Sequence, residues 1–325
     1  MDKVLAPARA ISHPKEKRGR IFEVDFLRGV AICLMVLLHF CYTLGFGPKD
    51  FYGIKYGDEP EWFVPLARLF RFVFCSITQP SGFFSMHSTN DALYMNNFTN
   101  LHCLEVFWAG MFMFLAGLSC TLSKNNFKRG LNIFMVANLL SMVLELGSDL
   151  IEPFDMHIWC GILHALGIAI MLFSLYDHFL PKWWQTFIAF ILLTIAVGFI
   201  IPNAYVIDPR TDVRSVPSIY PELSPFKDFG EFFENMGKLF IGLVRQGDDY
   251  FSPVLVTTAV FGGASVGKTL YKKKKSLLPS WFKGRWGKPI CFVGRHTLII
   301  YAAHQVVGAL LLIIIMSASG VPLDL

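Results

Sequence analysis

The sequence predicts an all-α polytopic membrane bundle of about seven to nine transmembrane helices, with its N-terminus in the cytoplasm. Three observations support this fold class. Of the 325 residues, 54% are apolar and only 16% are charged, against roughly 25% charged residues in ordinary soluble domains. The apolar residues gather in blocks of about 20, the length that an α-helix needs to cross a bilayer. Lysines and arginines cluster at the ends of alternate blocks.

Seven blocks are predicted to span the membrane. The first, FLRGVAICLMVLLHFCYTLGF (26–46), has no small-residue cleavage site, so we interpret it as an uncleaved anchor. The last, PICFVGRHTLIIYAAHQVVGALLLIIIM (289–316), is longer than one crossing needs. We therefore expect it to tilt or to begin outside the hydrocarbon. The spans between them cover residues 103–122, 131–148, 158–177, 183–202 and about 251–270.

Basic residues set the predicted orientation. Most of them lie in the N-terminal segment 1–24 and in the loops 123–130 and 268–288. With seven spans these regions fall on one side, and the positive-inside rule makes that side the cytoplasm. We therefore divide the chain into a basic cytoplasmic segment (1–24), a membrane domain (25–316) and a C-terminal tail (317–325).

Two long segments, 47–102 and 203–250, fall on the other side. Each contains a stretch that suits a surface or re-entrant helix, at 61–74 and at 230–244, which leaves the helix count open by one or two. The seven cysteines lie mostly within apolar runs, and no C-x-x-C spacing indicates a metal site. Cys75 and Cys103 are expected to share the outer compartment, where one disulfide is an option.

The stretch GGASVGKT (262–269) fits the phosphate-loop pattern G-x-x-x-x-G-K-[ST]. A phosphate loop joins a buried strand to a soluble helix, whereas these residues end an apolar run of membrane-span length. The run 171–177, which mimics the partner aspartate motif, also ends a span. Small residues at such positions let membrane helices approach closely. The sequence therefore argues against nucleoside triphosphate hydrolysis.

Three histidines lie inside predicted spans, where ionisable groups are costly and often functional. His39 follows Arg28 by eleven residues, which is about 16 Å at 1.5 Å per residue and close to three full turns. His164 and His304 reach similar depths in the fourth and last spans. Each alone is explained equally well as a hydrogen-bonding contact between helices. Together they predict a convergent set of imidazoles, which are able to take a proton from a hydroxyl or an amine.

Basic residues at the cytoplasmic ends of the spans are candidates for binding an anion. Arg28 and Arg295 lie at the polar ends of their spans, where guanidinium groups suit phosphate. Asp25 lies three residues before Arg28, so the two can pair on one helix face. The alternative is that the cations only set topology, which we prefer for Lys272 to Lys275, with contact to anionic lipid. The loop candidates for phosphate are Lys124, Lys128 and Arg129.

Four stretches resemble known membrane enzymes. VDFLRGVAICLMVLLHF (24–40) resembles the first-span signature of integral-membrane acyltransferases, in which an Arg-Gly or Arg-Ala pair precedes a histidine by eleven positions. Three further pieces resemble a narrower group, the heparan-alpha-glucosaminide N-acetyltransferase catalytic-domain family and its bacterial relatives. They are FWAGMFMFLAGLSCTLSKNNFKRG (107–130), IWCGILHALGIAIML (158–172) and FVGRHTLIIYAAHQVV (292–307).

The resemblance implies a reaction. Acetyl-CoA or another acyl-CoA is held from the cytoplasm, and its acyl group passes to an acceptor at the other face. The stretch DDYFSPVLVTT (248–258) departs from the family's D-Y-F-P and P-W steps, which puts the acceptor contacts in question. The large extra lumenal domain of the eukaryotic enzymes is missing, which argues against heparan as the acceptor and for a bacterial cytoplasmic membrane. The residues that match the family's signatures are Arg28, His39, His164, Arg295 and His304.

We therefore expect a membrane-embedded acyltransferase that modifies a hydroxyl or an amine of an envelope glycan or glycolipid. His39 is the expected general base or transient acyl carrier, and His164 and His304 are expected to orient it or stabilise the oxyanion. The donor is acyl-CoA, no metal is required, and the expected partners are membrane lipids and the acceptor. The weaker candidates for acceptor contacts are Glu105, Asp155, Trp159 and Asp249.

Two other classes of function stay open at this stage. A transporter or channel would use the histidines as a proton relay. A haem or metal protein would use them as ligands. The composition carries no nucleic-acid signature.

Overall fold

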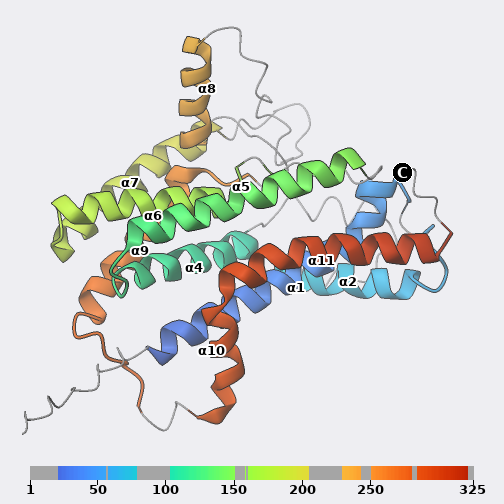
Figure 1. The fold of residues 1–325 in the computed structure, drawn as a ribbon, viewed down its shortest axis with the longest axis horizontal. Helices are drawn as coiled ribbons and strands as arrows, with labels where there is room; N and C mark the ends of the chain where they lie inside the picture. Colours follow the sequence, from blue (N-terminus) through green and yellow to red (C-terminus); the bar gives the residue numbers. More distant parts are fainter. Residues whose placement is uncertain are drawn as a thin grey trace, which may run out of the picture.

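A computed structural model describes residues 21–55, 58–78, 103–150, 158, 160–204, 229–242, 250–279 and 284–320. These residues form helices joined by turns, with no strand among them, so the predicted all-α fold is confirmed. A short 3-10 turn at Arg285–Gly287 precedes α10. The helices shown in Figure 1 are α1 (Phe22–Tyr52), α2 (Val64–Thr78), α4 (Cys103–Cys120), α5 (Asn126–Leu150), α6 (Ile162–Phe179), α7 (Trp183–Ala204), α8 (Phe229–Ile241), α9 (Pro253–Leu270), α10 (Lys288–Arg295) and α11 (Thr297–Ala318).

Four helices contain segments long and apolar enough to cross a bilayer: Phe22–Pro48 of α1, Asn126–Gly147 of α5, and the whole of α6 and α11. Shorter apolar segments lie at Ala109–Cys120 of α4 and Trp183–Phe199 of α7. Together with α9, these helices coincide with the seven predicted spans. The total of seven to nine crossings stays a prediction. The two stretches predicted as outer helices are helical too, as α2 and α8.

One face of α5 shows how the bundle meets its surroundings. Met135, Leu139, Met142 and Leu146 are each more than half exposed. Their spacing of four, three and four residues puts them on one side of the helix. An apolar stripe of this kind suits contact with lipid rather than with water. The membrane prediction and the burial pattern therefore agree.

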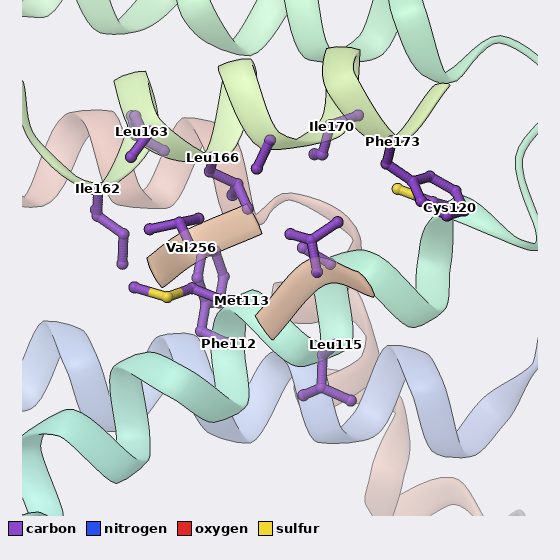
Figure 2. Close-up of a cluster of buried hydrophobic side chains, with 14 of the residues drawn as sticks. Phe112, Met113, Leu115, Cys120, Ile162, Leu163, Leu166, Ile170, Phe173 and Val256 are labelled. Atoms are coloured by element: carbon purple, nitrogen blue, oxygen red, sulfur yellow. The ribbon is translucent and has the colours of Figure 1, made fainter. Parts of the chain in front are cut away.

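The main core lies where α4, α6 and α9 meet. In α6 nearly every residue from Ile162 to Ile170 is buried, because this helix is apolar on all sides and other helices surround it. Figure 2 shows the interlocking side chains, which include Phe112, Met113 and Leu115 of α4, Leu166 and Phe173 of α6, and Val256 of α9.

The phosphate-loop-like residues lie inside helix α9 and pack against α4. A Cβ added to Gly263 would lie 1.8 Å from the backbone oxygen of Phe114, and one added to Gly117 would lie 2.0 Å from that of Val260. Glycine is therefore needed at both places for the two backbones to touch. This close packing is the role that the sequence analysis preferred for the small residues.

The lysine of the same motif is occupied by protein groups. Lys268 Nζ donates to Pro181 O and to Thr186 Oγ1, both at 2.9 Å, and forms an ion pair with Asp177. Lys268 thus fastens the end of α9 to the turn between α6 and α7. The apparent partner aspartate does contact the lysine, but as part of a helix-end clamp.

The predicted last span is divided in the structure. α10 ends at Arg295 and α11 begins at Thr297, with His296 between them. The run 289–316, predicted as a span that is tilted or begins outside the hydrocarbon, is therefore made of two helices. The extra length, which was expected to lie outside the hydrocarbon or to need a tilt, forms a separate helix that packs on α1.

Two glycines bring α10 against α1. A Cβ on Gly29 would lie 2.0 Å from the backbone oxygen of Ile290, and a Cβ on Gly294 would lie 1.8 Å from that of Asp25. Any larger residue at either position would push the helices apart. Gly29 is the glycine of the Arg-Gly pair in the first-span signature. Its contact explains why a glycine is needed there, because it places α10 and the start of α11 beside the N-terminal part of α1.

Candidate functional site

The structure brings His39 of α1 and His304 of α11 into contact. Their ring centroids are 4.8 Å apart and the ring planes are inclined by 82°, an edge-to-face arrangement. His304 is buried, with 5% of its surface exposed, and His39 is half-buried. Thr43 of α1 lies near Gly308 of α11 in the next layer, which shows that the same helix faces continue the contact.

Hydrogen bonds to the backbone fix which nitrogen of each ring carries the proton. His39 Nδ1 lies 2.9 Å from Met35 O, and His304 Nδ1 is hydrogen-bonded to Tyr301 O. A carbonyl oxygen only accepts, so both Nδ1 atoms must be donors. In the neutral rings Nε2 is then left with a lone pair. His304 Nε2 is buried without a hydrogen-bond partner among the described residues.

His164 does not share this contact. It is buried in α6, and its ring lies edge to face with that of Phe134 in α5, with centroids 5.8 Å apart. Gly167, one turn further along α6, lies against the backbone of Gly130. Of the three histidines expected to converge, two do so, while the described contact of His164 belongs to the packing of α5 on α6.

Arginines gather at the end of the bundle where α1, α5 and α11 begin, which we call the basic end. Arg28 donates to Thr297 Oγ1 at 3.0 Å. Arg129 donates to Ala116 O at 3.1 Å and approaches Cys120 Sγ at 3.5 Å. The positive charges of Arg28 and Arg129 are close enough to repel each other. Within the described part of the chain neither guanidinium forms an ion pair.

Asp25 does not form the ion pair with Arg28 that the spacing allows. Asp25 Oδ2 instead lies 3.1 Å from Arg295 Nε of α10. The glycine contacts between α1 and α10 bring Arg295 to this carboxylate, and Arg28 is left to Thr297. The charge of Asp25 still acts on Arg28 from nearby, although it makes no direct contact.

A pocket of ≈ 560 Å³ opens at the same end, beside Cys120. Lys124 lies on its wall and is exposed, and Lys128 is exposed on the following turn of α5. The pocket and the arginines are therefore neighbours, joined through the contact of Arg129 with Cys120. This end of the bundle combines cations and an opening, and His39 lies about 16 Å from Arg28 along the axis of α1.

The catalytic family of heparan-alpha-glucosaminide N-acetyltransferase matches residues 20–101 and 83–306. The chain belongs to this family. No curated protein and no solved structure matches. Membership of the family points to a transferase, and with the apolar helices it supports an integral membrane acetyltransferase.

The candidate acceptor contacts of this acetyltransferase-family chain fall mostly outside the described residues. Asp155, Trp159 and Asp249 lie there, and Glu105 lies in α4 at a position whose side chain is not described. Cys75 of α2 and Cys103 of α4 also lie at positions whose side chains are not described, so the disulfide stays a prediction. In the described part of the chain no group of three or more His, Cys, Asp or Glu is arranged to hold a metal.

The loop after α9 is held to the start of α1 by one carboxylate. Glu23 accepts hydrogen bonds from Ser276 Oγ and from the backbone N–H of Leu277, both at 2.6 Å. Burial, and then the negative charge of Glu23, raise the pKa of Tyr271 to about 12. Burial likewise raises the pKa of the Cys291 thiol in α10. The two hydrogen bonds to Glu23 therefore hold the lysine-rich loop after α9 against the start of α1.

Sequence reasoning missed several residues of this region. Thr297, which holds Arg28, directly follows the Arg-His pair of the last signature, so its place in GRHT was the available signal. Asn126 and Cys120 come from the turn between α4 and α5, and only the folded contact shows their relation. Neither has a spacing that predicts a site.

Proposed function

We propose that this chain moves an acetyl or short acyl group from cytoplasmic acyl-CoA to a hydroxyl or an amine of a glycan or glycolipid on the other face of a bacterial plasma membrane. The observation that carries the proposal is the contact of His39 with His304, which lies within the bundle and about three helical turns from Arg28. Cations at one end of α1, with the half-buried His39 deeper along the same helix and the buried Nε2 of His304 beside it, suit a phosphorylated thioester donor. The family membership supports the same reaction.

The donor binds at the basic end. Arg28 and Arg129 have no carboxylate of their own among the described residues, so their charge is available for the phosphates of CoA, for which guanidinium groups offer paired donors. Lys124 and Lys128 add positive charge at the opening. Arg295 contributes less, because Asp25 already neutralises it.

His39 acts as the general base in the proposed reaction. Its Nε2 takes the proton of the acceptor's O–H or N–H, while the oxygen or nitrogen attacks the carbonyl carbon of the thioester. The C–S bond then breaks, and the leaving thiolate of CoA takes the proton from the imidazolium. One acyl bond forms, one breaks, and His39 returns to its neutral form.

His304 holds the acceptor beside His39. Its buried Nε2 carries a lone pair that lacks a donor, and buried polar groups are normally hydrogen-bonded. A second N–H of an amine acceptor, or a neighbouring hydroxyl of a sugar acceptor, supplies that donor. The oxyanion role expected for His304 is dropped, because its only N–H in the neutral ring is bound to Tyr301. His164 is proposed to support the packing of α5 and α6.

The acceptor side is proposed from chemistry and from the family's name. That name describes an amino sugar as the group acetylated, so a glycan amine is one acceptor to test. Glu105, Asp155, Trp159 and Asp249 remain the candidates for its contacts, since carboxylates and indole rings bind sugar hydroxyls and sugar faces.

The ring contact disfavours one of the other classes of function. A haem held by both imidazoles would need them on opposite faces of the porphyrin, whereas the His39 and His304 rings touch directly. A proton relay would use the same pair, and it differs from the proposal in predicting flux without release of CoA.

Release of CoA tests the proposal. Purified full-length chain in lipid nanodiscs is given acetyl-CoA with and without glucosamine or a panel of sugar alcohols, and free thiol is measured. We expect acceptor-dependent thiol release, and an increase of about tenfold in the KM for acetyl-CoA in Arg28→Gln. No acceptor-dependent release from the native chain with any of these acceptors would contradict the proposal.

A further inference from the structure

Helix α5 carries an amide side chain on an exposed face, at the depth of the membrane interior. Within the described part of the chain α5 packs mainly on α6 and α11, and Gly130 lies against Gly167 of α6 (Figure 1). Asn138 lies near the middle of the apolar segment Asn126–Gly147, and its side chain is exposed. In a membrane this amide therefore faces hydrocarbon rather than water.

The helix itself satisfies only part of the Asn138 amide. Nδ2 donates one hydrogen to Phe134 O at 2.7 Å. An asparagine amide has two N–H donors and an oxygen acceptor. One N–H and Oδ1 are thus left without a partner among the described residues. Lipid chains offer no hydrogen bonds, so these groups favour a polar partner on another helix.

Thr194 of α7 gives a contrast on another exposed helix face. Its side chain is also exposed, but Oγ1 donates its single hydrogen to Phe190 O at 2.8 Å. Thr194 therefore has no donor left to offer. Asn138 keeps both a donor and an acceptor, so it gains more from a partner in the membrane than Thr194 does.

The exposed residues around Asn138 have the spacing of a contact between two helices. Leu131, Met135 and Met142 are 41%, 60% and 70% exposed. Together with Asn138 they follow one another at intervals of four, three and four residues, which is the repeat of helices that pack side by side. Methionine side chains are flexible enough to fit an irregular partner surface. This face therefore suits a second helix, with Asn138 within the contact.

The amide of Asn138 is complementary to itself, which indicates a second copy of the same helix. Copies of one membrane protein are inserted in the same orientation, so two α5 helices meet in parallel about a two-fold axis along the membrane normal. Residues near that axis contact their own counterparts. The free N–H of one Asn138 then donates to Oδ1 of the other, as a buried asparagine does in a parallel coiled coil.

We propose that the chain forms a homodimer in the membrane through the α5 face made of Leu131, Met135, Asn138 and Met142, with the two Asn138 amides hydrogen-bonded across the two-fold axis. The proposal does not depend on the proposed acyl transfer, because it uses only the membrane-spanning helix and its exposed face.

Association of the purified full-length chain in liposomes tests the proposal, since no other protein is present. Donor-labelled and acceptor-labelled chains are mixed, and energy transfer is measured as the ratio of protein to lipid is varied. Asn138→Leu should weaken association about three- to thirtyfold, the range for a hydrogen bond between membrane helices. Leucine suits lipid, so this variant should still fold. Asn138→Gln keeps the amide and should retain most of the association.

Matched controls locate the interface on α5. Thr194→Val removes a polar group from α7 and should leave association unchanged. Under oxidation Met142→Cys should form a disulfide with its own copy, whereas Leu192→Cys on α7, where the native residue is 61% exposed, should behave as the native chain does. A native chain that stays monomeric at every ratio leaves this face to lipid or to another membrane protein, and overturns the proposal. A dimer that Asn138→Leu leaves intact, or that Met142→Cys does not cross-link, overturns it as well.

Discussion

His39 and His304 touch edge to face inside the bundle, with ring centroids 4.8 Å apart. Each ring donates its Nδ1–H to a carbonyl of its own helix, so the pair presents two Nε2 lone pairs and no spare donor. Two adjacent acceptors call for a group that brings hydrogen-bond donors. A primary amine brings two N–H donors, and a sugar acceptor brings two when the reacting hydroxyl has a second hydroxyl beside it, so this relationship decides what the proposed acceptor must look like.

Replacing His304 by phenylalanine keeps a ring at the contact and removes Nε2. If that nitrogen holds the acceptor, kcat should fall by about a hundredfold, near the lower range for acid–base groups. His164→Phe is the contrast, because the ring of His164 packs on Phe134. It should change kcat little and act on thermal stability instead. Equal losses of kcat in both variants would contradict the separate roles of the two histidines.

Two glycines of α4 form a matched pair for testing helix packing. A Cβ on Gly117 would lie 2.0 Å from Val260 O in α9, whereas one on Gly110 has nothing within 4 Å. Gly117→Ala should therefore lower the free energy of unfolding by about 1–3 kcal/mol. Gly110→Ala should raise it by up to about 1 kcal/mol. Thermal denaturation in detergent compares them, and an unchanged melting temperature in Gly117→Ala would show that α9 does not pack this tightly.

Glu59 and Arg71 form a buried ion pair, with Arg71 Nη1 2.6 Å from Glu59 Oε1 and 2.9 Å from Gly45 O of α1. Glu59→Leu removes this carboxylate from a buried guanidinium, so it should cost about 3–5 kcal/mol. The double variant Glu59→Leu with Arg71→Met removes both charges and should recover most of that loss. Denaturation of the three proteins measures this, and a double variant as unstable as the single one would contradict the account.

The raised pKa of Tyr271 predicts a loss of stability at high pH. Burial and the charge of Glu23 raise the pKa from 10.0 to about 12. Below pH 10 the phenol is neutral in both folded and unfolded chains, so its contribution is complete. Between these values the unfolded chain gives up the proton first, and stability falls as pH rises. Tyr271→Phe should have a flatter melting-temperature profile over this range, and an identical slope would refute the shift.

The fold could be predicted from the sequence because a helix that crosses a membrane must be apolar along its length, and composition alone reveals such stretches. Blocks of about 20 apolar residues have few ways to satisfy their backbone other than as helices. The positions of the helices were therefore found within a few residues at most ends. The break at His296 was not foreseen, since α10 and α11 follow each other within the single run 289–316.

The site was predicted in part. Helical spacing related His39 to Arg28, but it could not say which helices are neighbours, so His164 was grouped with two rings that it does not contact. The ion pair of Asp25 with Arg295 could not be predicted for the same reason. A spacing of three residues allows a local partner, whereas the glycines of α1 and α10 bring a distant arginine closer. The hydrogen bond of Asn126 to Cys120 O crosses the turn between α4 and α5, and no sequence period encodes it.

Transfer of label from acetyl-CoA is the most direct test of the central claim. The native chain, His39→Ala and the control His296→Gln are incubated with acetyl-labelled CoA and an amino sugar, and labelled product is counted. We expect the native chain and the control to form product at similar rates, and His39→Ala to lose about a hundredfold or more in kcat. Product formed by His39→Ala at the native rate would contradict the account.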